Sequence, residues 1–488
     1  LSRDGGAHWQ NVTPPGLPAW SFITAIEQSP HAPGTVYLSA TRYKVEDYSP
    51  YLFKTTDYGA TWVRIDGSLP TYQGRSQITR VIREDAVRPG LLFVGSETGL
   101  YFSLDDGANW QRMIANLPIA PIYDLKIKDG DLVVATHGRA FWILDDITPL
   151  REASAKIQKP GSPPDPAILF TPRPTIRYNL NWGVSPARGA GKNYMMGLGS
   201  AFTFIEEKGE HNEQQRKMLD AGENPPAGVI IYYWLESIPS SPLTLTITDS
   251  AGNEVKRFTS KHADAPKDEV TLPAKAGLNR FVWDMRYPDA VKVPGDLTTE
   301  KAATGPRAAP GAYQVVLTVG ETSQQASFEI RIDPSLQVSQ ADLDAQFALW
   351  QQITDKISET HAGINKVRKI RRQLDGWIER AAENQQIVDA ARAIHEKLST
   401  IERELIQTEA KTGNDRLRMP SRLNTKLINL IGIVAAADVR PPQQAYAVLS
   451  HLGSQVDEQL ALLDGLLGDD LTAFNDLVLS AHLTPVHV

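Results

Sequence analysis

The chain has 488 residues, 41% of them hydrophobic and 22% charged, with a formal net charge of −7. Its length is too great for one hydrophobic core and predicts roughly three or four globular domains. The mild acidity excludes nucleic acid as the main ligand, and the absence of cysteine excludes disulfides, thiolate zinc sites and cysteine nucleophiles. No apolar window is long enough for a transmembrane helix, and no cofactor or metal is expected.

A turn motif with the pattern S/T-x-D-x-G-x-x-W occurs three times in the first third of the chain. Its tryptophans, Trp9, Trp62 and Trp110, recur at a period of about 50 residues, which is typical of propeller blades or of another repeat array. Between these turns, short runs of alternating β-branched and aromatic residues are separated by Gly and Pro and predict antiparallel strands. Residues 1–150 are therefore expected to form about three blades, each a small antiparallel sheet.

These motifs resemble the Asp-box, or BNR-repeat, propeller family, which includes sialidases, sortilin-like propellers and xyloglucan-cleaving hydrolases. The resemblance is strongest to large exported bacterial proteins described as glycosyl hydrolase-like or sortilin-like. It implies that the Asp holds its own turn, that the Gly has a positive φ and that the Trp packs between strands. The residues to which it assigns these structural roles are Ser2, Asp4, Gly6, Trp9, Thr55, Asp57, Gly59, Trp62, Ser103, Asp105, Gly107 and Trp110.

A propeller of this family has more blades than residues 1–150 can form. We therefore expect Leu1 to lie inside a blade, with the upstream half supplied by the same precursor or by a separate chain. Blades left open at both ends would expose apolar sheet faces. The absence of cysteine and the resemblance lead us to expect an extracytoplasmic protein, periplasmic or secreted, with no signal peptide in this chain.

A Pro-rich stretch, 151–175, is predicted to be a linker with the first strand of a second domain. Strand patterns resume through 176–335 and predict an Ig-like β-sandwich, in which Trp283 and Tyr313 are expected to be core or edge aromatics. The polar stretch 206–226 within it contains Glu206 and His211 and is predicted to be a solvated loop rather than a cation site.

From residue 336 to 488 the apolar residues follow helical spacing, beginning with an N-cap pair formed by Ser339 and Asp342. We expect an α-helical bundle of four long helices and a short one, whose apolar seams also allow an oligomer. The basic run 366–372 has helical spacing and is predicted to be a solvated helix face.

Three functions are compatible with this organisation: a binding or scaffold protein that recognises a protein or a glycan, a glycoside hydrolase, and a structural subunit of a larger assembly. A hydrolase needs two carboxylates facing one cleft. The candidates for such a pair are Glu97, Asp47, Asp145 and Asp146, none of which lies in a recognisable catalytic motif. A sialidase is disfavoured because its arginine triad is not visible. The candidate ligand-binding residues are Tyr43, Tyr48, Tyr51, His137 and Arg139.

Overall fold

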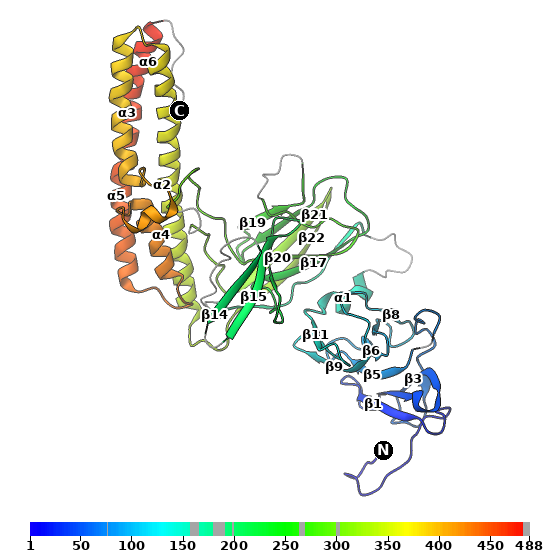
Figure 1. Cartoon of the computed structure of the whole chain (residues 1–488). Helices are drawn as coiled ribbons and strands as arrows, with labels where there is room; N and C mark the ends of the chain where they lie inside the picture. Colours follow the sequence, from blue (N-terminus) through cyan, green and yellow to red (C-terminus); the bar gives the residue numbers. More distant parts are fainter. Residues whose placement is uncertain are drawn as a thin grey trace.

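The computed structural model describes residues 1–75, 77–156, 165–178, 191–197, 200–262, 269–298 and 303–481. Figure 1 shows small β-sheets at the N-terminal end, a larger pair of β-sheets after them, and a long helical bundle formed by the C-terminal part. Of the predicted linker, residues 157–164 lie outside the described residues. Within the described part of the chain, no helix has the length and apolar content needed to cross a membrane.

The N-terminal region consists of three antiparallel sheets in which strands consecutive in sequence are neighbours. Each sheet is a meander, as the alternating apolar pattern between turns predicts. The first contains β1 (Phe22–Gln28), β2 (Val36–Arg42), the short turn η1 (Tyr43–Val45), β3 (Asp47–Thr55) and β4 (Val63–Arg64). The second contains β5 (Thr79–Glu84), β6 (Leu92–Ser96), β7 (Leu100–Ser103) and β8 (Gln111–Arg112), and the third contains β9 (Ile122–Lys128), β10 (Asp131–Thr136) and β11 (Phe141–Leu144).

The second sheet is packed between the other two. Phe93 of β6 belongs to a core shared with the third sheet, and its neighbour Val94 belongs to a core shared with the first. Successive side chains of a strand point to opposite faces, so both faces of this sheet are covered. The outer sheets leave apolar residues exposed, including Ile26 of β1 and Phe141 of β11. Consecutive meanders stacked face to face form part of a β-propeller, the arrangement expected from the repeats.

A helix that the sequence analysis did not predict follows the third sheet. This helix, α1 (Thr148–Lys156), crosses the boundary expected at residue 150. Asp146 Oδ1 accepts a hydrogen bond from the first-turn amide of Thr148 at 3.0 Å, and Pro149 occupies the second helical position, where its missing N–H is not needed. Arg151 donates from Nε and Nη2 to the buried carboxylate of Asp85 at 2.9 and 2.8 Å, which fixes the helix on the second sheet.

The middle region contains a β-sandwich with one hydrophobic core between two sheets. Trp283 and Tyr313 are both buried in it, with their rings edge-to-face at 5.9 Å. The smaller sheet contains β12 (Ala167–Leu169), β17 (Val229–Leu235) and β20 (Gly277–Trp283). The larger contains β13 (Thr175–Arg177), β22 (Thr322–Ile332), β21 (Gly311–Val319), β18 (Thr244–Thr248) and β19 (Glu254–Thr259).

The polar stretch predicted as a loop is partly a sheet. Residues 206–208 end β15 (Ser200–Lys208), which lies between β14 (Lys192–Gly197) and β16 (Gln214–Met218). Arg216 Nε donates to Glu206 Oε1 at 2.8 Å across this sheet. The loop prediction was wrong for residues 206–208 and 214–218, because cross-strand pairing of charged side chains stabilises strands that hydropathy does not reveal.

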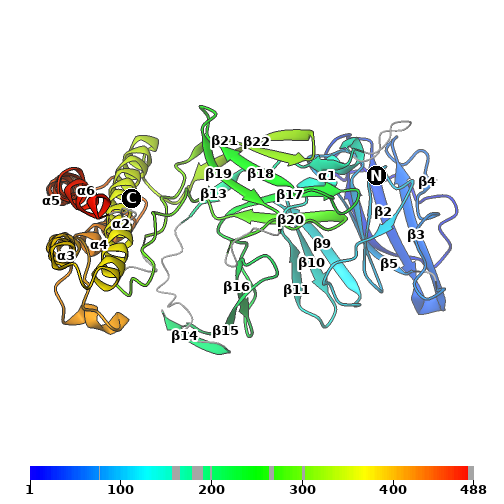
Figure 2. The ribbon, with the colours of Figure 1, turned by 90° about the horizontal axis from the view of Figure 1, so that it is seen from above.

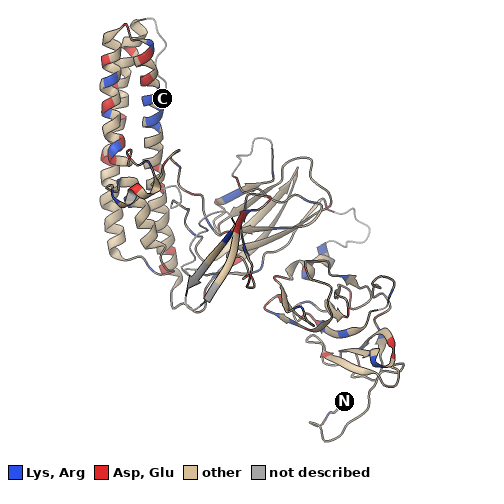
Figure 3. Cartoon of the chain, in the orientation of Figure 1, with Lys and Arg blue, Asp and Glu red and all other residues tan. Residues whose placement is uncertain are grey.

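The C-terminal region is a bundle of long helices, seen nearly end-on in Figure 2. The Ser339 and Asp342 side chains form the expected capping box at the start of the first of them. The helices are α2 (Gln340–Arg380), α3 (Gln385–Leu405), α4 (Leu423–Val434), α5 (Gln443–Gly468) and α6 (Asp470–Ser480), with a short turn, η2 (Gly413–Leu417), before α4. Charges of both signs are distributed along the bundle (Figure 3).

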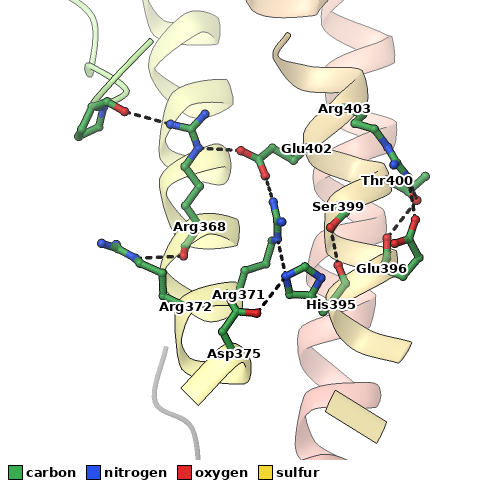
Figure 4. A network of polar contacts seen from close by, with 11 residues as sticks. Arg368, Arg371, Arg372, Asp375, His395, Glu396, Ser399, Thr400, Glu402 and Arg403 are labelled. Atoms are coloured by element: carbon green, nitrogen blue, oxygen red, sulfur yellow. Dashed lines mark hydrogen bonds and ion pairs between the residues drawn. The ribbon is translucent and has the colours of Figure 1, made fainter. Parts of the chain in front are cut away.

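The basic run 366–372 is only partly a solvated face. Figure 4 shows Arg368 and Arg371 of α2 reaching the same carboxylate, Glu402 of α3. Arg368 Nε donates to Glu402 Oε1 at 2.6 Å, and Arg371 also donates from Nε to His395 Nε2 at 3.2 Å. Glu402 is buried, so these arginines supply its charge compensation and fix the register of α3 on α2.

Candidate functional site

The three S/T-x-D-x-G-x-x-W turns have the same hydrogen bonds. In the second turn, Gly59 N donates to Thr55 Oγ1 at 2.9 Å, and Thr61 N donates to Asp57 Oδ1 at 2.8 Å. Hydrogen bonds from the Thr61 hydroxyl, from the Thr61 amide and from the Thr55 hydroxyl lower the pKa of Asp57. Equivalent bonds close the other turns, between Gly6 and Ser2, His8 and Asp4, Gly107 and Ser103, and Asn109 and Asp105. The Asp side chains therefore hold their own turns.

The second and third box tryptophans each donate a hydrogen bond to the repeat unit that precedes them in sequence. Trp62 Nε1 donates to the carbonyl of Val12 at 2.8 Å, and Trp110 Nε1 donates to the carbonyl of Ile65 at 2.6 Å. Each acceptor lies three residues after the tryptophan of the preceding unit. Trp9 is 75% exposed and donates only to a carbonyl of its own turn.

The box turns lie at one end of the sheets, and most candidate residues lie at the other. Adjacent strands in each sheet are antiparallel. The first strand therefore starts at the same end of the sheet as the turn that joins the second strand to the third. The turns β2–β3, β6–β7 and β10–β11 are at this end, opposite the boxes. We call it the hairpin face, represented by Tyr43, Arg80, Glu97, Tyr123 and His137.

In each of the three N-terminal sheets, the first strand has a β-bulge at the hairpin face. The pairing register shifts between Ile23 and Ala25, between Thr79 and Val81, and at Tyr123. The extra residues in these bulges are Thr24, Arg80 and Tyr123. A bulge bends its strand and re-aims the extra side chain.

Arg80 and Tyr123 meet in a column of side chains drawn from all three sheets. The Arg80 guanidinium lies 5.4 Å from the ring centroid of Tyr43 and 4.4 Å from that of Tyr123. The His137 ring stacks on Tyr123 with a centroid distance of 4.9 Å, and Arg80 Nε donates to Glu97 Oε2 at 2.8 Å. The column therefore combines cation–π contacts, an aromatic stack and an ion pair.

The outer members of this column are accessible. Tyr123 is 49% exposed and His137 is exposed, whereas the Arg80 side chain is mostly covered. Sequence reasoning found Tyr43, Glu97 and His137 but missed Arg80 and Tyr123.

The other two candidate tyrosines, Tyr48 and Tyr51, lie with Asp47 in β3. Tyr51 is buried and its hydroxyl donates to Asp47 Oδ2 at 2.6 Å, while Arg42 Nη1 reaches the same oxygen at 2.8 Å. The Tyr51 hydrogen bond is the main cause that lowers the pKa of Asp47 to about 2. Tyr48 is exposed beside it. Asp47 is thus ionised at neutral pH and unsuited to act as a general acid. Arg139, the other binding candidate, is exposed in the β10–β11 turn.

Asp145 and Asp146 are not at the hairpin face. They follow β11, which runs from the hairpin face toward the box end. Burial raises the pKa of Asp145, whose backbone carbonyl accepts the Tyr232 hydroxyl of the sandwich at 3.4 Å. Asp146 begins α1. The structure therefore separates these two carboxylates from Glu97 and Asp47 by the length of a strand.

The two candidate carboxylates at the hairpin face, Glu97 and Asp47, are not arranged as an acid–base pair. Glu97 is ion-paired with Arg80, and Asp47 with Arg42. Glycoside hydrolysis needs one carboxyl that remains protonated before the reaction. Within the described residues there is also no group of three or more His, Cys, Asp or Glu side chains arranged to hold a metal ion. The column can bind and orient a ligand through rings and charges.

Blade-like sheets, a β-sandwich and a helical bundle define a multidomain protein that contains part of a β-propeller. The chain matches no family model and no curated protein sequence. Among solved structures it is similar to the GH74 enzyme of Niastella koreensis, with 11% identity, 63% of this chain and 46% of that chain covered, and a TM-score of 0.21. For the GH74 xyloglucanase from Xanthomonas campestris the values are 12%, 63%, 47% and 0.19.

The chain thus spans less than half the length of either enzyme. At these identities and TM-scores the similarity assigns neither enzyme's activity to it.

Proposed function

We propose that this chain belongs to a propeller-based binding protein whose hairpin face binds a glycan. The observation that carries the proposal is the column formed by Tyr43, Arg80, Tyr123 and His137, which presents a half-exposed Tyr123 ring. The apolar face of a sugar ring can pack on the exposed His137 ring and on the exposed part of Tyr123, and Arg80 and Glu97 can hydrogen-bond to hydroxyl groups. The contacts of Tyr123 with Arg80 and His137 hold its ring in place, which reduces the entropy cost of binding.

The test is binding of soluble oligosaccharides, measured by calorimetry after a glycan-array survey. Tyr123→Ala is expected to weaken binding by about tenfold or more, because the stacking surface is lost. The matched control is Tyr194→Ala, which removes an exposed tyrosine from β14, outside the three blades. If peptides bind and glycans do not, the ligand of the hairpin face is a protein and not a glycan. An absence of Tyr123-dependent binding to either class would refute the proposal.

The hydrolase alternative makes a different prediction for the same samples. A hydrolase would release reducing ends from a bound polysaccharide, and Glu97→Gln would abolish that release. A binding protein leaves the polysaccharide intact. We favour the binding protein because Glu97 and Asp47, the two candidate catalytic carboxylates at this face, are both ion-paired.

We also propose that a further blade of the same repeat type packs on the first sheet. Trp9 and Trp20 are 75% and 87% exposed there, together with Phe22 and Ile26. The carbonyl acceptors that Trp62 and Trp110 find in the preceding unit support this occupant over an unrelated protein. Intact mass and N-terminal sequencing of material that co-purifies natively should identify a polypeptide with further box motifs. A stable, lone monomer that binds no hydrophobic dye would contradict it.

Two finer assignments belong to this proposal. The sandwich is assigned to the Ig-like class, on its two facing sheets of three and five strands. The protein is assigned an extracytoplasmic location, which cell fractionation with an antibody against the chain would test.

A further inference from the structure

A polar pocket of about 540 Å³ lies where the β-sandwich meets the helical bundle. Arg286 follows β20 and Arg307 precedes β21, and both line the pocket from the sandwich side. Trp350 of α2 and Asn429 of α4 line it from the bundle. The pocket is therefore built from two regions, far from the hairpin face in the chain.

Arg286 and Arg307 are directly opposite each other in an isolated antiparallel bridge. The flanking hydrogen bonds run from Tyr287 N to the carbonyl of Pro306 at 3.0 Å and from Ala308 N to that of Met285 at 2.7 Å. The two arginines thus form a non-hydrogen-bonded pair, the geometry in which cross-strand side chains approach most closely. Like charges in this position destabilise a sheet unless an anion compensates them.

Two described carboxylates, Asp284 and Asp438, line the pocket and attract Arg286 and Arg307 respectively, but neither comes within ion-pair distance of these guanidinium groups. Arg286 Nη1 donates to the carbonyl of Gly305 at 2.8 Å, and Arg307 Nη2 donates to that of Tyr178 at 3.0 Å. Neither guanidinium forms an ion pair with a described carboxylate. Asp438, the buried carboxylate of the pocket, is already paired with Arg177 at 2.8 Å.

Burial of Arg307 makes its positive charge costly unless a negative charge compensates it. Desolvation, followed by the nearby charges of Arg177 and Arg286, lowers the pKa of Arg307 to about 10. Trp350 is 3% exposed, and its Nε1 has no hydrogen-bond acceptor among the described residues. Hydrogen-bond donors are therefore in excess at this pocket, and an unpaired buried donor or cation is costly.

We propose that this pocket is a binding site for an oxyanion, a phosphate or carboxylate group held between Arg286 and Arg307. Two guanidinium groups side by side offer paired N–H donors that match the oxygens of either group. Because the lining comes from both regions, the bound anion also fastens the sandwich to the bundle. The site is independent of the glycan proposal.

The experiment measures thermal unfolding and calorimetric binding of the full chain, with inorganic phosphate and citrate as separate probes at constant ionic strength. We expect saturable binding of at least one probe. Arg307→Gln should weaken it by about tenfold or more, because hydrogen bonds between charged partners are lost. Arg257→Gln is the matched control, since it removes the same charge from exposed β19 of the same sandwich. Tighter binding of phosphate or of citrate identifies the group the pocket prefers.

A second readout separates a binding role from a structural one. Without a multivalent anion, Arg307→Gln should unfold at the same temperature as the wild type or at a higher one, because a like-charge pair is relieved. A lower unfolding temperature would show that Arg307 is structural and overturn the proposal. The proposal would also be overturned if phosphate and citrate raised the unfolding temperature of Arg307→Gln as much as that of the wild type, or if neither probe bound saturably.

One more variant tests whether a carboxylate of the chain itself occupies the position of the proposed anion. Glu300 lies outside the described residues and is the acidic residue nearest in sequence to Thr304 of the pocket. Glu300→Gln is expected to leave phosphate and citrate affinity unchanged. A clear rise in affinity would mean that Glu300 competes for the arginines, and the pocket would then be an internal ion-pair site.

Discussion

Replacing Gly107 by Ala tests whether the box turns bring neighbouring sheets into contact. Gly107 has φ +85°, and a Cβ built there lies 3.0 Å from both Cβ and Cδ1 of the buried Ile65 in the preceding unit. The substitution therefore imposes two costs. One is a left-handed backbone conformation on a residue with a Cβ, and the other is a steric overlap between two sheets.

The two costs can be estimated and separated. The left-handed conformation costs about 1–2 kcal/mol and overpacking about 1–3 kcal/mol, so the total destabilisation is about 2–5 kcal/mol. Gly138 has φ +80° with no atom within 4 Å of its built Cβ, so Gly138→Ala reports the conformational cost alone. In an Ile65→Ala background the contact with Cδ1 disappears while the contact with Cβ remains, so the effect of Gly107→Ala should fall part of the way toward that of Gly138→Ala.

The assay is amide hydrogen exchange, read by mass spectrometry as a local free energy of opening in the intact chain, in β6, β7 and β8 for Gly107→Ala and in β10 and β11 for Gly138→Ala. A local readout is needed because the separate regions do not unfold as one unit. If Gly107→Ala costs no more than Gly138→Ala, or if its effect is the same with and without Ile65, the contact between the sheets is not the one described here.

Three further outcomes are expected. Glu402→Gln should lower bundle stability by about 1–3 kcal/mol, because two charge-assisted hydrogen bonds weaken, and an unchanged urea midpoint in far-UV circular dichroism would contradict this. Asp85→Asn should cost about 2–5 kcal/mol by leaving Arg151 without its carboxylate, seen as faster hydrogen exchange in α1. Burial lowers the pKa of His361 below 6.5, so the unfolded chain binds a proton that the folded chain does not, and stability is lost as the pH falls below about 6.5. His361→Phe should flatten that pH dependence, and an equally steep profile would contradict the assignment.

Periodicity alone predicted the blades and the bundle. A period of about 50 residues with turn motifs indicated repeated meanders, and helical spacing with the Ser339–Asp342 cap indicated where the bundle begins. These features follow from local hydrogen bonding and from one apolar face per element. Both depend on residues that are close together in the sequence. Helix α1 was missed because it is short and polar, and Asp85 fixes it from a distant turn.

The candidate sites depended on contacts that sequence order does not contain. Arg80 and Tyr123 come together because bulges in two different strands turn their side chains toward one face. Arg286 and Arg307 face each other only because the chain returns to form one antiparallel bridge. The sequence by itself determined the repeat, the strand and helix patterns and the box turns, whose interactions span a few residues. The tertiary structure decided which charges are paired, buried or left without an anion, because those properties depend on the distance between residues remote in sequence and on the water they exclude.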